Sequence, residues 1–117
     1  MSVSSSHLEK AQAVFDVEIA ALQRTRARLD GEFDEAVELL RTTLAAGGKI
    51  IVTGVGKSFH IGQKIAATFT STGAPANVLH PSEAMHGDLG LLQAEDAVLA
   101  LSYSGESDEL VNLLPII

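Results

Sequence analysis

The sequence contains no cysteine, few aromatic residues and no long apolar run. Without cysteine, a disulfide framework, a thiolate zinc site and a cysteine nucleophile are all excluded. No apolar stretch approaches the roughly 20 residues that a membrane-spanning helix needs, and the first six residues have neither the basic nor the hydrophobic part of an export signal. These absences predict a soluble cytoplasmic protein that is stabilised by packing alone.

Positive charge is also scarce, and it is unevenly distributed. The chain has 8 Lys and Arg against 15 Asp and Glu, which gives a formal net charge of -7. Beyond residue 46 the only basic residues are Lys49, Lys57 and Lys64. Nucleic acids select basic surfaces that displace counterions, so this balance argues against a nucleic-acid partner.

The length and hydrophobicity of the chain limit it to one ordered domain or part of one. Its 117 residues are 46% hydrophobic and 20% charged. A chain with this much apolar material buries a core, and stable domains usually run to roughly 100–150 residues. Wholesale disorder and a two-domain enzyme are therefore both excluded.

The first 46 residues have the pattern of two amphipathic helices. Ser6 and Glu9 have the spacing of a capping box at a helix start, and Asp30 is placed to cap a second helix that ends at Gly47–Gly48. Apolar residues recur every seven positions in the first helix: Leu8, Phe15, Leu22 and Leu29. We expect residues 1–46 to form a helical arm, which packs either on its own domain or on another subunit.

Residues 47–117 alternate between strand and helix patterns. Short β-branched or apolar runs predict three strands, at 49–53, 76–79 and 97–101, with a helix to about residue 71 after the first and another from Glu106. This order is typical of an α/β fold with a parallel sheet and right-handed crossovers. Because the sheet would have only three strands, we expect residues 47–117 to be the first part of a longer domain, or a partner to complete the sheet.

A glycine-rich turn follows the first predicted strand. Gly54–Ser58 invites a nucleotide-binding interpretation, but a Walker A loop needs glycine at Ile51 and the dinucleotide fingerprint needs it at Phe59. Both interpretations fail on spacing. The turn is either an anion site, formed by backbone amides at a helix start, or a plain tight turn.

A second turn, rich in hydroxyl groups, follows the third predicted strand. It contains Ser102, Ser104 and Ser107. Parallel strands end at one edge of a sheet, so these serines are expected to lie near Ser58 and to hold one phosphate group together. Each serine alone would more often be a helix cap or a turn residue, Ser107 above all.

The segment between the two turns gathers ionisable residues. His80, Glu83, His86 and Asp88 fall within nine positions. Such a cluster either binds a metal or moves protons, and the alternative is a solvated loop. No His-Glu-x-x-His motif is present, so a metalloprotease helix is excluded.

Four motifs in this order resemble those of the sugar isomerase (SIS) domain, and more narrowly those of bacterial arabinose-5-phosphate isomerases of the KpsF/GutQ type. The motifs are Gly54–Ser58, Ser71–Pro75, His86–Gly90 and Ser104–Ser107. The resemblance implies a three-layer αβα domain, with flavodoxin-like strand order when complete. It also implies an aldose–ketose isomerase that interconverts arabinose 5-phosphate and ribulose 5-phosphate through an enediol, feeding Kdo and lipopolysaccharide synthesis. Further catalytic residues and a CBS pair of such proteins would lie beyond residue 117, so this chain alone is expected to be inactive.

The resemblance also implies roles for individual residues. Lys57 and Glu109 match catalytic positions. His80 matches a position associated with zinc, which would inhibit the enzyme, and the family requires no cofactor. The substrate-contacting positions are Ser58, Gly73, Ala74, His86, Ser102, Ser104, Ser107 and Asn112. From the residues themselves, Lys57 could equally be a solvated lysine and Glu109 an acid favoured by a helix dipole.

The same resemblance leaves other functions open. SIS domains also occur in regulators that bind a sugar phosphate without turning it over, but these usually carry a DNA-binding helical domain, and the acidic arm shows no helix-turn-helix pattern. A structural fragment that assembles through its sheet edge is a third possibility. Relatives form dimers or tetramers, which predicts a homo-oligomer.

Overall fold

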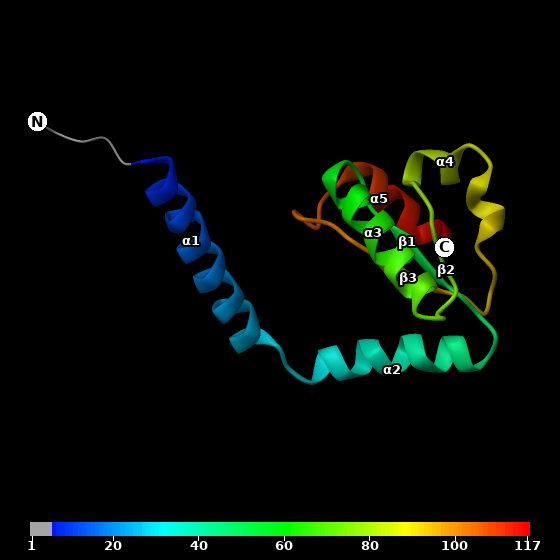
Figure 1. Ribbon diagram of the computed structural model, residues 1–117. Coiled ribbons are helices and arrows are strands. Elements are labelled where there is room, and N and C mark those ends of the chain that lie inside the picture. Colours follow the sequence, from blue (N-terminus) through cyan, green and yellow to red (C-terminus); the bar gives the residue numbers. More distant parts are fainter. Residues whose placement is uncertain (1–5) are drawn as a thin grey trace, which may run out of the picture. The chain divides into compact units, whose positions relative to one another are not determined.

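The computed structural model describes residues 6–117, which form helices and one parallel sheet (Figure 1). The elements are α1 (His7–Arg28), α2 (Gly31–Ala45), β1 (Ile50–Thr53), α3 (Lys57–Ser71), β2 (Ala76–Val78), α4 (Pro81–Met85), the 3-10 helix η1 (Asp88–Leu91), β3 (Ala97–Ala100), α5 (Asp108–Leu113) and the 3-10 helix η2 (Leu114–Ile116). Two compact units are distinguished, one ending at Ala36 and one spanning Val37–Ile117. None of the described helices is long and apolar enough to cross a bilayer.

Both predicted helix starts in the N-terminal region are confirmed. The Glu9 amide donates to Ser6 Oγ over 3.1 Å, and the Ser6 amide donates to the Glu9 carboxylate over 3.2 Å, which completes a capping box. At the start of α2, the Glu32 amide donates to Asp30 Oδ1 over 3.0 Å. Side chains therefore satisfy amides that a helix end otherwise leaves unpaired.

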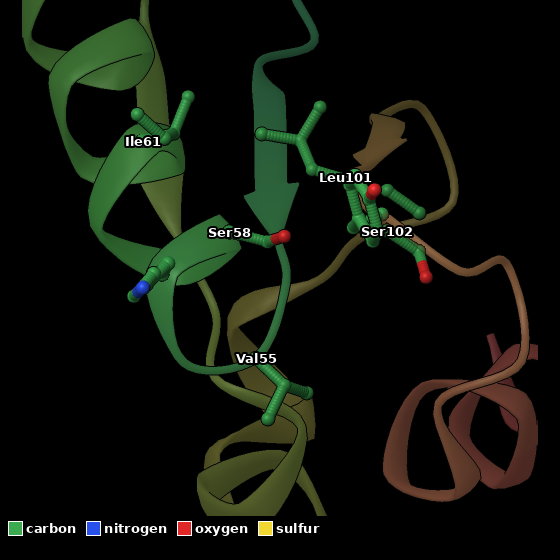
Figure 2. A pocket seen from close by; sticks show the side chains of 8 residues that line it. Val55, Ser58, Ile61, Leu101 and Ser102 are labelled. Carbon is green, nitrogen blue, oxygen red and sulfur yellow. The ribbon is translucent and has the colours of Figure 1, made fainter.

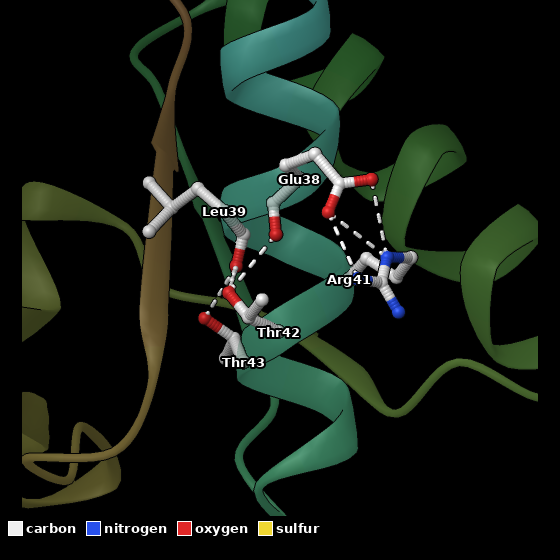
Figure 3. A network of polar contacts seen from close by, with 5 residues as sticks. All are labelled: Glu38, Leu39, Arg41, Thr42 and Thr43. Atoms are coloured by element: carbon white, nitrogen blue, oxygen red, sulfur yellow. Dashed lines mark hydrogen bonds and ion pairs between the residues drawn. The ribbon is translucent and has the colours of Figure 1, made fainter.

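The second half of α2 is tied together by short-range polar contacts (Figure 3). Arg41 donates to the Glu38 carboxylate, with Nη2 to Oε2 at 2.9 Å, and these hydrogen bonds together with the arginine charge lower the pKa of Glu38. Thr42 and Thr43 donate to carbonyl oxygens one turn earlier. The ion pair is exposed, so it adds little stability.

The sheet has the order β2-β1-β3, with both pairs of strands parallel. Ile50 at the start of β1 is level with Ala76 in β2 and with Ala97 in β3. Central β1 is buried along its whole length, as expected for a strand that is covered on both faces. The predicted α/β class and parallel three-stranded sheet are confirmed.

Alternate residues of β1 face two different helical layers. Ile50 and Val52 pack with Ala66 of α3, and Leu40 and Leu44 of α2 extend that cluster. On the opposite face, Ile51 packs with three buried apolar side chains: Leu79, Ala84 of α4 and Leu113 of α5. Helices thus cover both faces, which gives the three-layer αβα arrangement.

An ion pair joins the starts of β1 and β3. Lys49 Nζ lies 2.6 Å from Asp96 Oδ2, and the Lys49 and Gln93 amides each donate to the same carboxylate over 2.9 Å. The Asp96 side chain is 1% exposed and that of Lys49 is 19% exposed. Burial by itself raises the pKa of Asp96, but the hydrogen bonds from Lys49 and Gln93 and the lysine charge bring it below its ordinary value.

Close backbone packing beside this pair requires a glycine. A Cβ at Gly48 would collide with the carbonyl oxygen of Glu95 and would lie 2.9 Å from Cγ2 of Thr43. The glycine therefore does more than end α2. It lets the turn into β1 pass against the segment that leads into β3.

The region after His80 differs most from the predicted elements. The short helices α4 and η1 occupy a segment for which no helix was predicted. The last helix begins at Asp108, two residues after the predicted start, because serine hydroxyls hold the preceding residues in turns. It is also short, since Leu114 and Pro115 continue as a 3-10 turn and proline has no amide hydrogen to extend an α-helix.

Replacing Thr53 with valine is expected to raise the free energy of unfolding by about 1–2 kcal/mol. Thr53 is 1% exposed, and its Oγ1 has no hydrogen-bond partner among the described residues. Valine keeps the shape and removes the unpaired hydroxyl. Urea denaturation would measure the change. Thr70→Val is the control and should not gain stability, because Thr70 Oγ1 already donates to the Ala76 carbonyl. A less stable Thr53→Val protein would contradict the prediction.

Candidate functional site

The carboxyl ends of β1 and β3 form a topological switch point. The chain leaves β1 through α3, which covers one face of the sheet, and leaves β3 through α5, which covers the other. The two connections diverge, so a crevice opens between the strand ends, where open α/β sheets bind their ligands. Two groups of hollows meet here, and Val55 lines both.

The first group is called the serine hollow and consists of two overlapping depressions. The smaller, of about 240 Å³, is lined by Val55, Ser58, Leu101, Ser102, Tyr103, Ser104 and Ser107. The larger, of about 900 Å³, shares five of these residues and adds Lys57, Ile61 and Ala100. Figure 2 shows Ser58 pointing from the first turn of α3 toward the loop that carries Ser102. The structure thus brings the four predicted serines together.

Two glycines shape the loop between β1 and α3. Gly56 has φ 61° and ψ −126°, a conformation that side chains disfavour. At Gly54 a Cβ would lie only 3.1 Å from the Leu101 carbonyl oxygen. The loop therefore passes close to the end of β3, and the first amides of α3, which a helix leaves unpaired, are available at the hollow.

The second loop is held by its own hydroxyl groups. The Gly105 amide donates to Ser102 Oγ over 2.8 Å, and the Glu106 amide donates to Ser104 Oγ over 3.1 Å. Each hydroxyl accepts in these bonds, so its own hydrogen remains free to donate to an anion. Turn chemistry and ligand binding are compatible at these serines.

Ser107 and Lys57 add uncommitted polar groups to the serine hollow. Ser107 was expected to hold the phosphate, with helix capping as the alternative role. It occupies the N-cap position of α5, but its side chain makes no capping hydrogen bond. Lys57 is exposed and forms no ion pair within residues 6–117. The hollow therefore offers hydroxyl donors and one cation, which suits a compact anion such as a phosphate group.

The second group is one depression of about 620 Å³, called the histidine hollow. Its lining residues are Val55, His80, Pro81, Ser82, Met85, His86, Glu109 and Asn112. The elements that contribute them, α4 with its flanking residues and α5, lie on the face of the sheet opposite α3. Glu109 and His86, both with expected roles at a substrate, therefore share one cavity next to the serine hollow.

His80 is held from two sides. Its Nδ1 accepts a hydrogen bond from the Ser82 amide over 3.0 Å and so caps α4. Its ring stands edge-on to Phe59, with ring centroids 4.8 Å apart and an interplanar angle of 73°. Only Nε2 is left for a ligand. His, Asp and Glu side chains form no cluster of three or more suited to a metal in the described part of the chain, so a zinc ion at His80 would need ligands from elsewhere.

Gly73 and Ala74 do not belong to this group of residues. They lie in the turn between α3 and β2, and the carbonyl of the next residue, Pro75, accepts a hydrogen bond from the amide of Ile50. Ile50 is the first residue of β1, whereas the hollows lie beyond its last residue, Thr53. In one copy of the chain these two residues are therefore at the opposite edge of the sheet.

Sequence reasoning missed three features of this edge. The pattern of alternating elements gave no sign that Val55 would line both hollows or that Phe59 would contact His80. No pattern pointed to Tyr103 either, although it lies between two serines that were expected to bind the phosphate. A lone apolar or aromatic residue in a loop carries no periodic signal.

The chain belongs to the SIS domain family, whose model matches residues 43–117. It is 46% identical over 117 residues to the arabinose 5-phosphate isomerase KdsD of Pseudomonas aeruginosa, covering 100% of this chain and 35% of that protein. It is 42% identical over 113 residues to GutQ of Escherichia coli K12, also named an arabinose 5-phosphate isomerase, covering 97% of this chain and 34% of that protein.

A solved structure gives the same result at the level of the fold. A protein of E. coli CFT073, described in complex with arabinose 5-phosphate, superimposes with a TM-score of 0.76 at 34% identity, covering 96% of this chain and 60% of that one. The chain spans about a third of the length of the curated relatives it matches.

Proposed function

We propose that the protein is an arabinose-5-phosphate isomerase that interconverts arabinose 5-phosphate and ribulose 5-phosphate. The observation that carries this proposal is the meeting of four serines and Lys57 in one hollow at the switch point, beside a second hollow that contains Glu109. The first hollow suits the phosphate group, and the second suits the reacting end of an opened sugar. The names of the relatives at 42–46% identity support this substrate.

The phosphate would be held mainly by neutral donors. The hydroxyls of the serine hollow and the free amides at the start of α3 surround the anion, and Lys57 supplies the nearby positive charge. Hydrogen bonds to a charged group are stronger than those between neutral groups. This arrangement fixes one end of the sugar without a large basic patch.

The reaction would proceed through an enediol. Glu109 takes the proton from C2 of the open-chain aldose while the negative charge moves to the oxygen at C1. Glu109 then returns the abstracted proton to C1. The hydroxyl at C2 passes its own proton to the oxygen at C1, which leaves a ketone at C2. Lys57 would stabilise the enediolate oxygen, where charge develops. His86 and Asn112 line the same hollow as Glu109 and are suited to hold the sugar hydroxyls.

The wider setting follows from the same proposal. In the reverse direction the reaction forms arabinose 5-phosphate from ribulose 5-phosphate, and this arabinose 5-phosphate would feed Kdo and lipopolysaccharide synthesis in the cytoplasm. The protein would work as a homo-oligomer without a required cofactor, and zinc would inhibit it at His80. A chelator should then relieve inhibition by added zinc and leave basal turnover unchanged.

The activity is tested by following ribulose 5-phosphate formation from arabinose 5-phosphate. The assay is run on the 117-residue chain and, where the coding sequence continues, on the longer product. Turnover by the longer product supports the proposal. Tight binding of the sugar phosphate without turnover would replace it with the alternative, a phosphosugar-binding regulator.

Replacing Ser104 with alanine should raise the dissociation constant for arabinose 5-phosphate by about tenfold or more, the effect of losing one hydrogen bond to a charged group. Calorimetry on the purified variant would measure the change. Ser71→Ala is the matched control, because Ser71 Oγ donates to the Thr68 carbonyl at the far end of α3. Equal affinities for Ser104→Ala and the unmodified chain would remove Ser104 from the site.

A further inference from the structure

We propose that Tyr103 is a binding residue for the sugar portion of the ligand, its ring covering the carbon chain once the serines hold the phosphate. The inference rests on the proposed function and extends it to a residue that contributes specificity. Tyr103 lines both depressions of the serine hollow.

The first observation is that the Tyr103 side chain has no structural role of its own. It is 103% exposed, more than any other large apolar or aromatic side chain in residues 6–117, and the hydrogen bonds found in this region do not involve its hydroxyl. A ring that buries nothing contributes little to folding. The ring is nevertheless large, and a ligand in the adjacent hollow would give it a surface to cover.

The second observation is that the backbone of Tyr103 is fixed although its side chain is free. The residue lies between Ser102 and Ser104, and both of these hydroxyls accept hydrogen bonds from amides further along the loop. Gly105, with φ 72°, completes the turn. The ring is therefore displayed at a defined place on the rim of the hollow, and ligand binding would have to order only its two side-chain torsions.

The third observation concerns the chemistry around the ring. The larger depression combines polar groups, from Ser58 and Lys57, with an apolar wall that includes Leu101 and Ile61. A sugar phosphate has the same two parts, a charged end and a carbon chain with apolar C–H bonds. With the phosphate among the serines and the reacting end beside Glu109, the carbons next to the phosphate lie against the apolar wall, and the Tyr103 ring covers their outer side. Inorganic phosphate has no such chain and would gain nothing from the ring.

Intrinsic tyrosine fluorescence can report the contact between Tyr103 and the sugar. The chain has one tyrosine and no tryptophan, so emission excited at wavelengths that phenylalanine does not absorb comes from Tyr103 alone. Titration with arabinose 5-phosphate is expected to change this emission, and inorganic phosphate at equal saturation should change it much less. Emission that responds equally to both ligands, or to neither, would overturn the assignment.

The affinities of variants distinguish a contact made by the Tyr103 ring from an effect on the fold. In calorimetry, Tyr103→Ala should raise the dissociation constant for arabinose 5-phosphate by about tenfold, leave that for inorganic phosphate unchanged and leave the melting temperature unchanged. Tyr103→Phe keeps the ring and should stay within about twofold of the unmodified chain. Phe33→Ala, which removes another exposed ring that lines neither hollow, should change neither affinity.

Each result has one meaning. Equal affinities of the unmodified chain and Tyr103→Ala for arabinose 5-phosphate would overturn the role of Tyr103 and leave the proposed function standing. An equal loss of affinity for both ligands would show that the residue acts on the phosphate or on the loop, which also overturns the inference. An unmodified chain that binds inorganic phosphate but not arabinose 5-phosphate would overturn the proposed function and this inference with it.

Discussion

Replacing Asp96 with alanine is expected to lower the free energy of unfolding by about 3 kcal/mol, because it leaves Lys49 and two backbone amides without their shared acceptor. The carboxylate is almost completely buried and receives three hydrogen bonds at 2.6–2.9 Å. The value is at the lower end for a buried pair, since Lys49 remains partly exposed. Urea denaturation at neutral pH would measure the loss.

The exposed pair of Glu38 and Arg41 provides the matched control. Its side chains are 60% and 65% exposed, so Glu38→Ala should change the stability very little. If Asp96→Ala unfolded no more readily than Glu38→Ala, the ion pair between the strand starts would have no structural role.

The same carboxylate makes stability depend on pH. The pKa of Asp96 is lower in the folded chain than its ordinary value of 3.8. Its stabilising effect is therefore complete above that ordinary value and is lost as the pH falls through the lower pKa of the folded state. Asp96→Asn, which keeps the shape but not the charge, should be less stable than the unmodified chain at neutral pH, and this difference should shrink in acid.

Replacing Lys57 with methionine is expected to reduce the turnover of arabinose 5-phosphate by about 10²–10³-fold, the effect of removing one donor to a developing oxyanion. Lys57 lines the larger depression of the serine hollow and has no acidic partner within residues 6–117. Its charge is thus available to the ligand. Steady-state kinetics on the catalytically active protein would measure the effect.

The control for Lys57 is Lys64→Met on the same helix. Lys64 Nζ donates to Thr68 Oγ1 and lines neither the serine hollow nor the histidine hollow, so this variant should keep full turnover. If Lys57→Met raised KM and left kcat unchanged, the lysine would serve only to bind the phosphate. Unchanged kcat and KM would exclude it from the reaction.

The sequence predicted the elements that rest on local patterns. The capping box at Ser6, the strand through Ile50–Thr53 and the end of α3 at Ser71 all follow from spacing and from residue types that are typical of caps, strands and breaks. The contacts of Asp96 with Lys49, 47 positions earlier, and of Gly48 with Glu95 were not predictable, because they depend on which strands become neighbours. The short helix α4 was missed because five residues are too few to show a helical period.

The candidate site was predicted best where topology alone determines it. Ser58 and Ser104 were expected to approach each other because parallel strands deliver their turns to one edge, and the structure places them there. The histidine hollow depended instead on the fold of residues 80–92, which no sequence pattern defined. Only the family resemblance predicted a role for Gly73, and a single copy of the chain places it at the other edge of the sheet.

The use of hydroxyl groups in the serine hollow has a consequence for its response to acidity. Serine hydroxyls do not ionise at physiological pH. Among the described residues that line the hollow there is no carboxylate and no histidine, and Lys57 is the one cation. The ligand does titrate, since a phosphate monoester gains its second negative charge near pH 6. The contribution of the serine hollow to affinity should then follow the titration of the ligand itself, so that this part of the pH profile of binding is a property of the metabolite.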